Sequence, residues 1–276
     1  MIQVPCDLCG GDDHALVLVK EGFRHVRCRA CGLVFVNPRQ AGHLETQRES
    51  GTGTMGDEVL SSSQKRRLHR ELELYRPYRK LNRIIEIGAG RGWLLGEASA
   101  AGWETWAVEV NSQALAHLGT RGIFRVIPES ADSVQAPEAH FDVVRMWDVI
   151  EHLESPRKVM ERMFRLLRPG GLLRISTTNF RSLSRWVNGP DWVYLNGADH
   201  IVLFEPRTVR QLLEICGFIS VRIRTRSFNL RKKRYHPEQD LSSVSPLVTP
   251  LRKLIDELIR FTPFGHQMVV SAKRPG

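Results

Sequence analysis

The stretch Ile84-Ile85-Glu86-Ile87-Gly88-Ala89-Gly90-Arg91-Gly92 decides the fold of this chain. Its isoleucines predict a short buried strand that contains one carboxylate, and its three alternating glycines predict a tight turn. A helix-like stretch covers residues 93–101. Strand, glycine-rich turn and helix, in this order, open a nucleotide-binding α/β unit.

The spacing of the glycines separates two kinds of nucleotide site. A dinucleotide fingerprint needs glycine or alanine three residues after its second glycine, where this chain has Trp93. Trp93 is too bulky for the helix to close on the strand at that point. Glu86 before a G-x-G-x-G turn resembles the first motif of class I S-adenosylmethionine (SAM)-dependent methyltransferases. In that family the loop passes beside a methionine-derived tail and an adenosine.

Glu109 supplies the second half of the signature. Residues 105–110 predict the next strand, and Glu109 lies near its end, about 20 residues after Gly88. An acidic residue at this distance is expected to bind the ribose, because a carboxylate can accept from both hydroxyls at once. The alternative for Glu109 is a solvated charge at a strand end.

Four of the five cysteines form two C-x2-C pairs, Cys6 with Cys9 and Cys28 with Cys31. The gap between the pairs falls in the range of roughly 15–20 residues that four-cysteine zinc sites show. Four thiolates make a closed tetrahedral zinc site, which is structural and not catalytic. Two disulfides are the alternative, which a cytosolic chain disfavours. Cys216 stands alone in an apolar stretch and is expected to be buried.

The chain has a formal net charge of +10 over 276 residues. Basic clusters at 65–67 and 231–234 lie in or beside linker-like segments with little aromatic interleaving. We interpret them as solvated surface and expect a small-molecule partner and no nucleic acid. The basic and amphipathic C-terminal segment leaves peripheral membrane contact open. No apolar run approaches the roughly 18 residues of a membrane helix, and the N-terminus does not resemble a signal peptide, so we expect a cytoplasmic protein.

Three regions follow from these patterns. Residues 1–40 predict a small β zinc ribbon, with strands in 15–26 and before Pro38. Residues 41–80 predict a linker or lid and a lead-in helix over 64–76. Residues 81–276 predict the SAM-dependent methyltransferase domain.

Strands and helices alternate in the third region, which argues for a parallel sheet covered on both faces. The expected strands are 82–87, 105–110, 124–127, 141–146, 171–176, 218–227 and 266–272, and the expected helices are 93–101, 112–119, 156–167, 205–216 and 251–261.

Further motifs resemble the ubiquinone-type O-methyltransferases and their relatives. They are the Phe-Asp-Val-Val-Arg-Met-Trp-Asp-Val-Ile-Glu-His-Leu stretch at 141–153, Leu-Leu-Arg-Pro-Gly-Gly at 166–171, Thr-Thr-Asn at 177–179, Asp-His-Ile-Val-Leu-Phe at 199–204 and Cys-Gly-Phe at 216–218. The resemblance runs from about residue 80 to 226, with Pro-Gly-Gly as a turn before the fifth strand. The ribbon also resembles the N-terminal metal domain that some members carry.

The resemblance implies an α/β, Rossmann-like sheet of seven strands, mostly parallel, with the last strand antiparallel and inserted beside the fifth. SAM would lie across the carboxyl ends of the first strands. The implied cofactor contacts are Glu86, Gly88, Ala89, Gly90, Gly92, Glu109, Val110, Ser130, Ala131, Trp147 and Asp148.

The implied reaction is in-line attack on a sulfonium methyl group. A hydroxyl acceptor must also lose its proton, and histidine is the natural base near neutral pH. His152 is the first candidate and His200 the second, although either residue alternatively serves only a structural role. Trp147, Trp186, Trp192 and Tyr194 are candidates for an apolar acceptor pocket or for the core.

The acceptor class is a lipid or quinone precursor, a sugar or a secondary metabolite, with a hydroxyl favoured over nitrogen or carbon. One alternative is an RNA methyltransferase that uses the ribbon and the basic clusters to bind nucleic acid. Another is a non-catalytic SAM- or zinc-binding module, which the intact Glu86, glycines and Glu109 disfavour.

Overall fold

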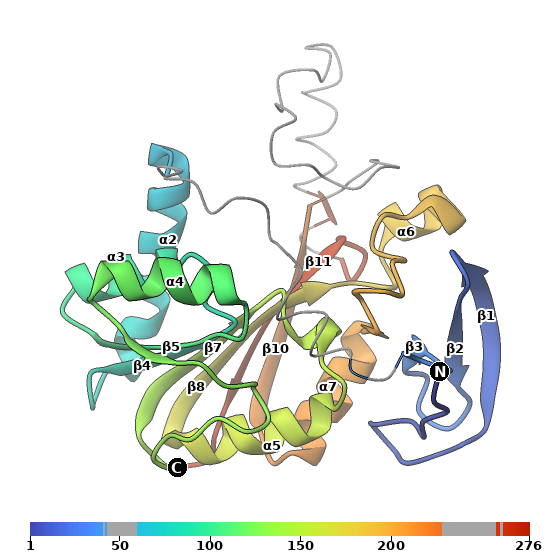
Figure 1. The fold of residues 1–276 in the computed structure, drawn as a ribbon, viewed down its shortest axis with the longest axis horizontal. Helices are drawn as coiled ribbons and strands as arrows, with labels where there is room; N and C mark the ends of the chain where they lie inside the picture. The colour runs from blue at the N-terminus through green and yellow to red at the C-terminus, as the bar shows by residue number, and fades with distance from the viewer. Residues whose placement is uncertain (41, 43–59, 228–257, 260–261) are drawn as a thin grey trace.

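The computed structural model of the chain describes residues 1–40, 42, 60–227, 258–259 and 262–276 (Figure 1). Its strands are β1 (His14–Lys20), β2 (Phe23–Cys28), β3 (Val34–Val36), β4 (Arg83–Ile87), β5 (Glu104–Val108), β6 (Arg125–Ile127), β7 (Phe141–Trp147), β8 (Leu167–Thr178), β9 (Val202–Leu203), β10 (Ile219–Arg226) and β11 (Gln267–Lys273). Its α-helices are α2 (Ser62–Tyr75), α3 (Trp93–Ala100), α4 (Ser112–Arg121), α5 (Pro156–Leu166), α6 (Leu183–Asn188) and α7 (Pro206–Ile215).

The central sheet has seven strands in the order β10-β11-β8-β7-β4-β5-β6. Strands β4 to β8 pair in parallel, whereas β11 runs antiparallel to both of its neighbours. The sheet therefore confirms the predicted fold, including the last strand inserted beside the fifth.

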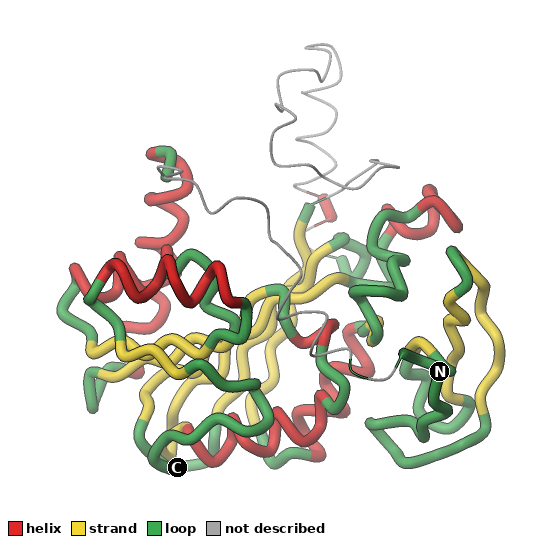
Figure 2. The backbone as a smooth tube through the Cα atoms, in the orientation of Figure 1, coloured by secondary structure: helices red, strands yellow, loops and turns green. Residues whose placement is uncertain are grey.

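Helices cover both faces of this sheet (Figure 2). Ile84 of β4 packs in one cluster with buried side chains of α2, α3 and α4. Ile85 and Ile87 point the other way and pack with α5 and α7. Burial of each isoleucine stabilises the fold by roughly 1.5–3 kcal/mol. The apolar run of β4 thus fixes this strand in the middle of three layers.

A second sheet of four strands, β1-β2-β3-β9, involves the N-terminal segment (residues 1–40). Val34 and Phe35 of β3 pair with Leu203 and Val202 of β9, and Val36 N donates to Ile201 O at 2.9 Å. The sequence analysis missed β9, because two residues carry no strand periodicity. The N-terminal sheet is therefore completed by residues that follow the central strand β8 by more than twenty positions.

Side chains also join the N-terminal segment to α5. The Asp7 carboxylate accepts from Ser155 Oγ at 2.6 Å and from Arg157 N at 2.7 Å. Arg39 Nη1 donates to Glu154 O at 2.9 Å. Cys6 and Leu8 belong to the same buried apolar cluster as α5 and α7. Residues 1–40 therefore pack beside α5 and α7, at one side of the molecule (Figure 1).

Some predicted boundaries were wrong. Helix α2 begins at Ser62, because the Ser61 side chain caps it in a reciprocal pair with Gln64. Strand β8 already begins at Leu167, so the predicted Pro-Gly-Gly turn is part of a strand with an irregular register near Val143. Helix α6 was not predicted. Of the predicted loop or lid over 41–63, residues 41 and 43–59 lie outside the described residues, and so does most of the predicted helix over 251–261.

Among the described residues, no helix combines the length and the apolar character needed to cross a membrane.

Candidate functional site

The glycine turn after β4 needs its glycines for two reasons. Gly88, Gly90 and Gly92 have φ values of 68°, 52° and 64°, in the left-handed region that side chains disfavour. A Cβ on Gly88 would overlap Val149 Cγ2, and one on Gly92 would lie 2.6 Å from Leu118 Cδ2. A Cβ on Gly90 would meet nothing within 4 Å. Gly88 and Gly92 are thus constrained by the protein itself, whereas Gly90 faces open space.

Glu109 lies directly after β5 and beside this turn. Its carboxylate accepts from Gly90 N at 2.8 Å, Val110 N at 2.8 Å and Asn111 N at 2.9 Å. The side chain is 8% exposed. The two halves of the predicted signature are therefore in direct contact, with Glu109 held by the backbone of Gly90 and Val110.

Glu86 occupies a different place from the other predicted cofactor residues. It is buried within β4 and forms an ion pair with Arg145, the residue opposite it on β7. The Arg145 guanidinium lies 4.2 Å from the centroid of the Trp147 ring. Glu86 is thus engaged inside the sheet, and its predicted contact with the cofactor stays a prediction. Sequence reasoning missed Arg145, because a lone arginine in a strand gives no sign of a buried partner.

The remaining predicted cofactor residues follow β6 and β7. Ser130 and Ala131 are both 8% exposed, and Ser130 Oγ donates to Asp132 Oδ1 at 2.6 Å. Asp148 has a φ of 54° and accepts from Ser176 Oγ at 2.8 Å and Gln267 Nε2 at 3.0 Å. Because parallel strands end at one edge, these residues lie along the same edge of the sheet as the glycine turn.

The two candidate histidines meet at this edge. The rings of His152 and His200 stand edge to face, with centroids 4.7 Å apart, and Tyr194 stacks on His200 at 5.6 Å. His152 Nδ1 lies 3.0 Å from Asp199 Oδ1 and 2.9 Å from Asp199 O. The first and second candidates for the base are therefore neighbours in one cluster.

Burial and neighbouring charges shift the pKa values of two residues in this cluster, His152 and Glu151. Burial lowers the pKa of His152, but the hydrogen bonds that it donates to Asp199 and the negative charges of Glu151 and Asp199 outweigh burial and raise the pKa to about 9. Burial raises the pKa of Glu151 to about 7, against the opposing charge of His152. Thr177 Oγ1 donates to Glu151 Oε2 at 2.8 Å. His152 is accordingly held as an imidazolium at neutral pH.

Sequence reasoning missed Asp199 and Glu151 as members of this cluster. Both are adjacent to a candidate histidine, in the pairs Glu151-His152 and Asp199-His200. The pairs were visible as motifs, but the contact of His152 with Asp199 joins two loops that no sequence pattern connects. The acid–histidine pairs were the only available signal.

The four aromatic residues that were candidates for the acceptor pocket differ in how deeply they are buried. Trp192 is 1% exposed and belongs to a buried apolar cluster with Val34 and Phe180. Trp186 is 81% exposed on α6. Trp147 and Tyr194 are half-buried. Trp192 is therefore a core residue, and Trp186 is a surface residue.

Four cysteines of the N-terminal segment gather their sulfurs within 4.8 Å of one another: Cys6, Cys9, Cys28 and Cys31. The Sγ atoms of Cys6 and Cys31 are 3.4 Å apart, and those of Cys9 and Cys28 are 3.5 Å apart. These thiols are not disulfide-bonded. Zn–S bonds of about 2.3 Å in a tetrahedron put sulfurs roughly 3.8 Å apart, so the donor set fits one zinc ion.

The basic cluster at 65–67 is exposed on α2, whereas 231–234 lie outside the described residues. Cys216 is buried and lies at the end of α7.

Comparison with known proteins gives a consistent result. The sequence profile of a family described as "Methyltransferase domain" matches residues 60–222. A ubiquinone biosynthesis O-methyltransferase of Caulobacter sp. (strain K31) is 31% identical over 103 residues, which cover 35% of this chain and 41% of that one. The chain spans about half the length, or less, of the curated relatives it matches.

Solved structures share the fold. A SAM-dependent methyltransferase from Archaeoglobus fulgidus superposes with a TM-score of 0.55 at 24% identity, covering 76% of this chain and 92% of the other. Haemonchus contortus phosphoethanolamine N-methyltransferase 2, in complex with S-adenosyl-L-methionine, gives 0.56 at 20% identity, covering 80% and 55%. At these identities the likeness concerns the fold alone.

Proposed function

Because the chain belongs to the methyltransferase domain family, we propose that it is a SAM-dependent methyltransferase that methylates a hydroxyl group of a small molecule. One observation carries this proposal. The glycine turn and the turn that leads to His152 touch each other, since a Cβ on Gly88 would overlap Val149. A base next to the cofactor loop suits an acceptor that must lose a proton.

The proposed cofactor site is built around Gly90 and Glu109. Space beside Gly90 is open, and Glu109 is held at the end of β5 by three backbone N–H groups. SAM, when bound, supplies an activated methyl group on a sulfonium, so the protein mainly positions the reactants and excludes water. Glu86, paired with Arg145, would act by fixing β4 under the turn.

His152 is the proposed base. Asp199 accepts from its Nδ1 and orients the ring, and the neutral imidazole, which forms as the pH rises toward about 9, would take the acceptor proton. His200 packs edge to face against His152 and would orient it. Quinone or lipid precursors, sugars and secondary metabolites all offer the required hydroxyl. The O-methyltransferase relatives support the hydroxyl over nitrogen and carbon.

The purified full chain is expected to bind SAM and S-adenosylhomocysteine, each with one site. The reason is the open space at Gly90 next to the buried Glu109. Isothermal titration calorimetry measures both affinities, and ATP serves as a control nucleotide that lacks the methionine tail. Absence of heat with both sulfur ligands, or equal affinity for ATP, would contradict the proposal.

We also propose that Cys6, Cys9, Cys28 and Cys31 hold one structural zinc ion. The sulfurs lie within 4.8 Å of one another, and the sheet they flank is small. A metal would supply folding energy to such a segment. Because β3 pairs with β9, which closely follows Asp199 and His200, the ion would also steady the histidine cluster.

The Cys28→Ser variant is expected to lose zinc and to lower turnover by roughly tenfold, while SAM affinity changes by less than roughly threefold. The reason is that β9 loses a firm partner, whereas the glycine turn is not part of this sheet. Metal analysis by mass spectrometry and calorimetry measure the two effects. Cys216→Ser is the control, since Cys216 lies outside the cluster. Wild-type protein purified without chelators that holds under about half an equivalent of zinc would count against the site.

A further inference from the structure

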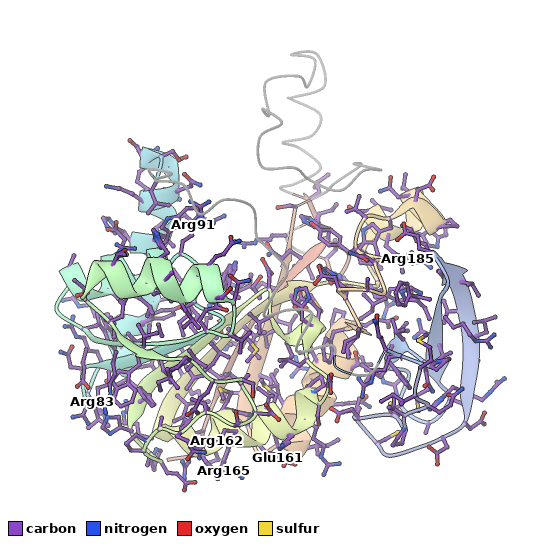
Figure 3. The ribbon with its side chains drawn as sticks, viewed as in Figure 1. Arg83, Arg91, Glu161, Arg162, Arg165 and Arg185 are labelled. Carbon is purple, nitrogen blue, oxygen red and sulfur yellow. The ribbon has the colours of Figure 1, made fainter. Side chains whose placement is uncertain are left out.

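A cavity of about 560 Å³ opens where the N-terminal sheet meets α6. Its lining includes Val17, Arg27, Phe180, Leu183, Arg185 and Trp186. Its volume is in the range of small-molecule sites. Figure 3 shows Arg185 in the region between α6 and the N-terminal strands. The cavity is therefore shared between the N-terminal segment and the methyltransferase fold.

The lining is positively charged. The guanidinium groups of Arg27 and Arg185 lie 5.7 Å and 4.7 Å from the centroid of the Phe180 ring, and Arg181 is a third basic residue. Glu205 is the one acid among the lining residues, and Arg27 Nη2 already engages it at 2.9 Å. The wall thus has an excess of positive charge that its own carboxylate does not balance.

Arg185 is the residue of this lining that most strongly favours an anionic ligand. Its Nε is buried and has no hydrogen-bond partner within the described part of the chain. Burial, together with the positive charge of Arg27, holds the pKa of the Arg185 guanidinium below its usual value. A buried donor without a partner costs about 1–3 kcal/mol. An anion at this place would relieve both the repulsion and the unmet hydrogen bond.

Three other residues of the lining are apolar and exposed. Trp186 is 81% exposed, Phe264 41% and Leu183 36%, and all three line the cavity. Apolar side chains that surround a charged group favour a ligand with an apolar body and a charged end. Neither a sugar nor a neutral hydrocarbon would satisfy both parts of this lining.

We propose that this cavity binds a small aromatic or aliphatic molecule that carries one anionic group, with the anion at Arg185 and the apolar body against Trp186 and Leu183. That this ligand is the methyl acceptor rests on the function proposed above. The class of ligand rests on the cavity alone.

A chain of ring contacts links the cavity to the histidine cluster. Phe180 follows Ser176 by four residues, which span at most about 14 Å, and Ser176 Oγ donates to Asp148 at 2.8 Å. Aromatic rings connect the two places, because Phe180 contacts Trp192 at 6.2 Å and Trp192 contacts Tyr194 at 5.2 Å. Tyr194 in turn stacks on His200.

Calorimetry of the full chain with 2-naphthoate tests the proposal, with the uncharged 2-naphthamide as the matched probe. We expect saturable binding of 2-naphthoate and binding of 2-naphthamide that is at least about tenfold weaker. Arg185→Gln should weaken 2-naphthoate binding by about tenfold and leave SAM affinity unchanged. Arg165→Gln, on α5 and away from the cavity (Figure 3), should change neither affinity.

Several results would overturn the proposal. One is equal affinity for 2-naphthoate and 2-naphthamide. Another is an equal loss of 2-naphthoate affinity in Arg185→Gln and Arg165→Gln. A third is binding of 2-naphthoate that does not saturate. Unchanged 2-naphthoate binding in Trp186→Ser would also refute the proposal, and a change of oligomeric state in the same variant would make this face an interface between copies of the chain. Failure of SAM binding with intact 2-naphthoate binding would refute the proposed function and leave the cavity assignment standing.

Discussion

The Gly90→Val variant is expected to lose at least about 100-fold in affinity for SAM and S-adenosylhomocysteine while it stays folded, a difference of about 2.7 kcal/mol. A Cβ at Gly90 meets no protein atom within 4 Å, so the fold has room for the side chain. The same space is where we propose that the cofactor lies. Calorimetry gives the affinity, and thermal unfolding followed by circular dichroism shows that the variant is folded.

Gly122→Val is the matched control for this experiment. Gly122 has a φ of 62°, close to the 52° of Gly90, and a Cβ there also meets nothing within 4 Å. It lies at the end of α4, outside the glycine turn. Both variants bear the strain of valine in the left-handed region, which costs of order 1–3 kcal/mol. Equal losses of SAM affinity in the two variants would show that strain, and not the cofactor space, is responsible.

The His152→Ala variant is expected to lower turnover by about 10²–10⁴-fold, the range typical for loss of a general base. SAM affinity should stay within roughly threefold, because the glycine turn and Glu109 are untouched. Steady-state kinetics and calorimetry separate the two effects. His69→Ala is the control, since His69 is an exposed histidine that is also paired with an acid, Glu97. Turnover within a few-fold of wild type would make His152 structural.

The pH profile gives an independent test of the same residue. The folded pKa of His152 is raised to about 9, above the usual 6.5. Its charged form therefore stabilises the fold fully below pH 6.5, and this contribution is lost as the pH rises through about 9. Only the neutral form can accept a proton, so wild-type turnover should rise with pH up to about 9. The residual activity of His152→Ala should lack this rise.

The parts of the fold and of the site that could be predicted depend on local sequence patterns. Three glycines at alternate positions allow the left-handed backbone that a tight turn needs, and the apolar run before them predicts a strand that is buried on both faces. Glu109 follows the next strand, so its place beside Gly90 depends only on two neighbouring parallel strands. The cysteine pairs likewise need only two turns and one hairpin to meet.

What could not be predicted depends on contacts between distant segments. His152 and Asp199 meet because two loops approach at the sheet edge, and their separation in sequence gives no signal of it. Strand β9 exists only because β3 offers it backbone partners. The ion pair of Glu86 with Arg145 depends on the register between β4 and β7, which one sequence cannot reveal.

The pairing of β3 with β9 also bears on where the molecule can be cut. The family match begins at residue 60, which invites expression of a shortened chain from that point. Such a chain would keep Val202, Leu203 and Phe204, which are at most 2% exposed in the intact protein, but would lack the strand that covers them. A bare edge with apolar neighbours is a template for aggregation. We therefore expect a chain that begins at residue 60 to aggregate, and a chain that keeps the first forty residues to stay in solution.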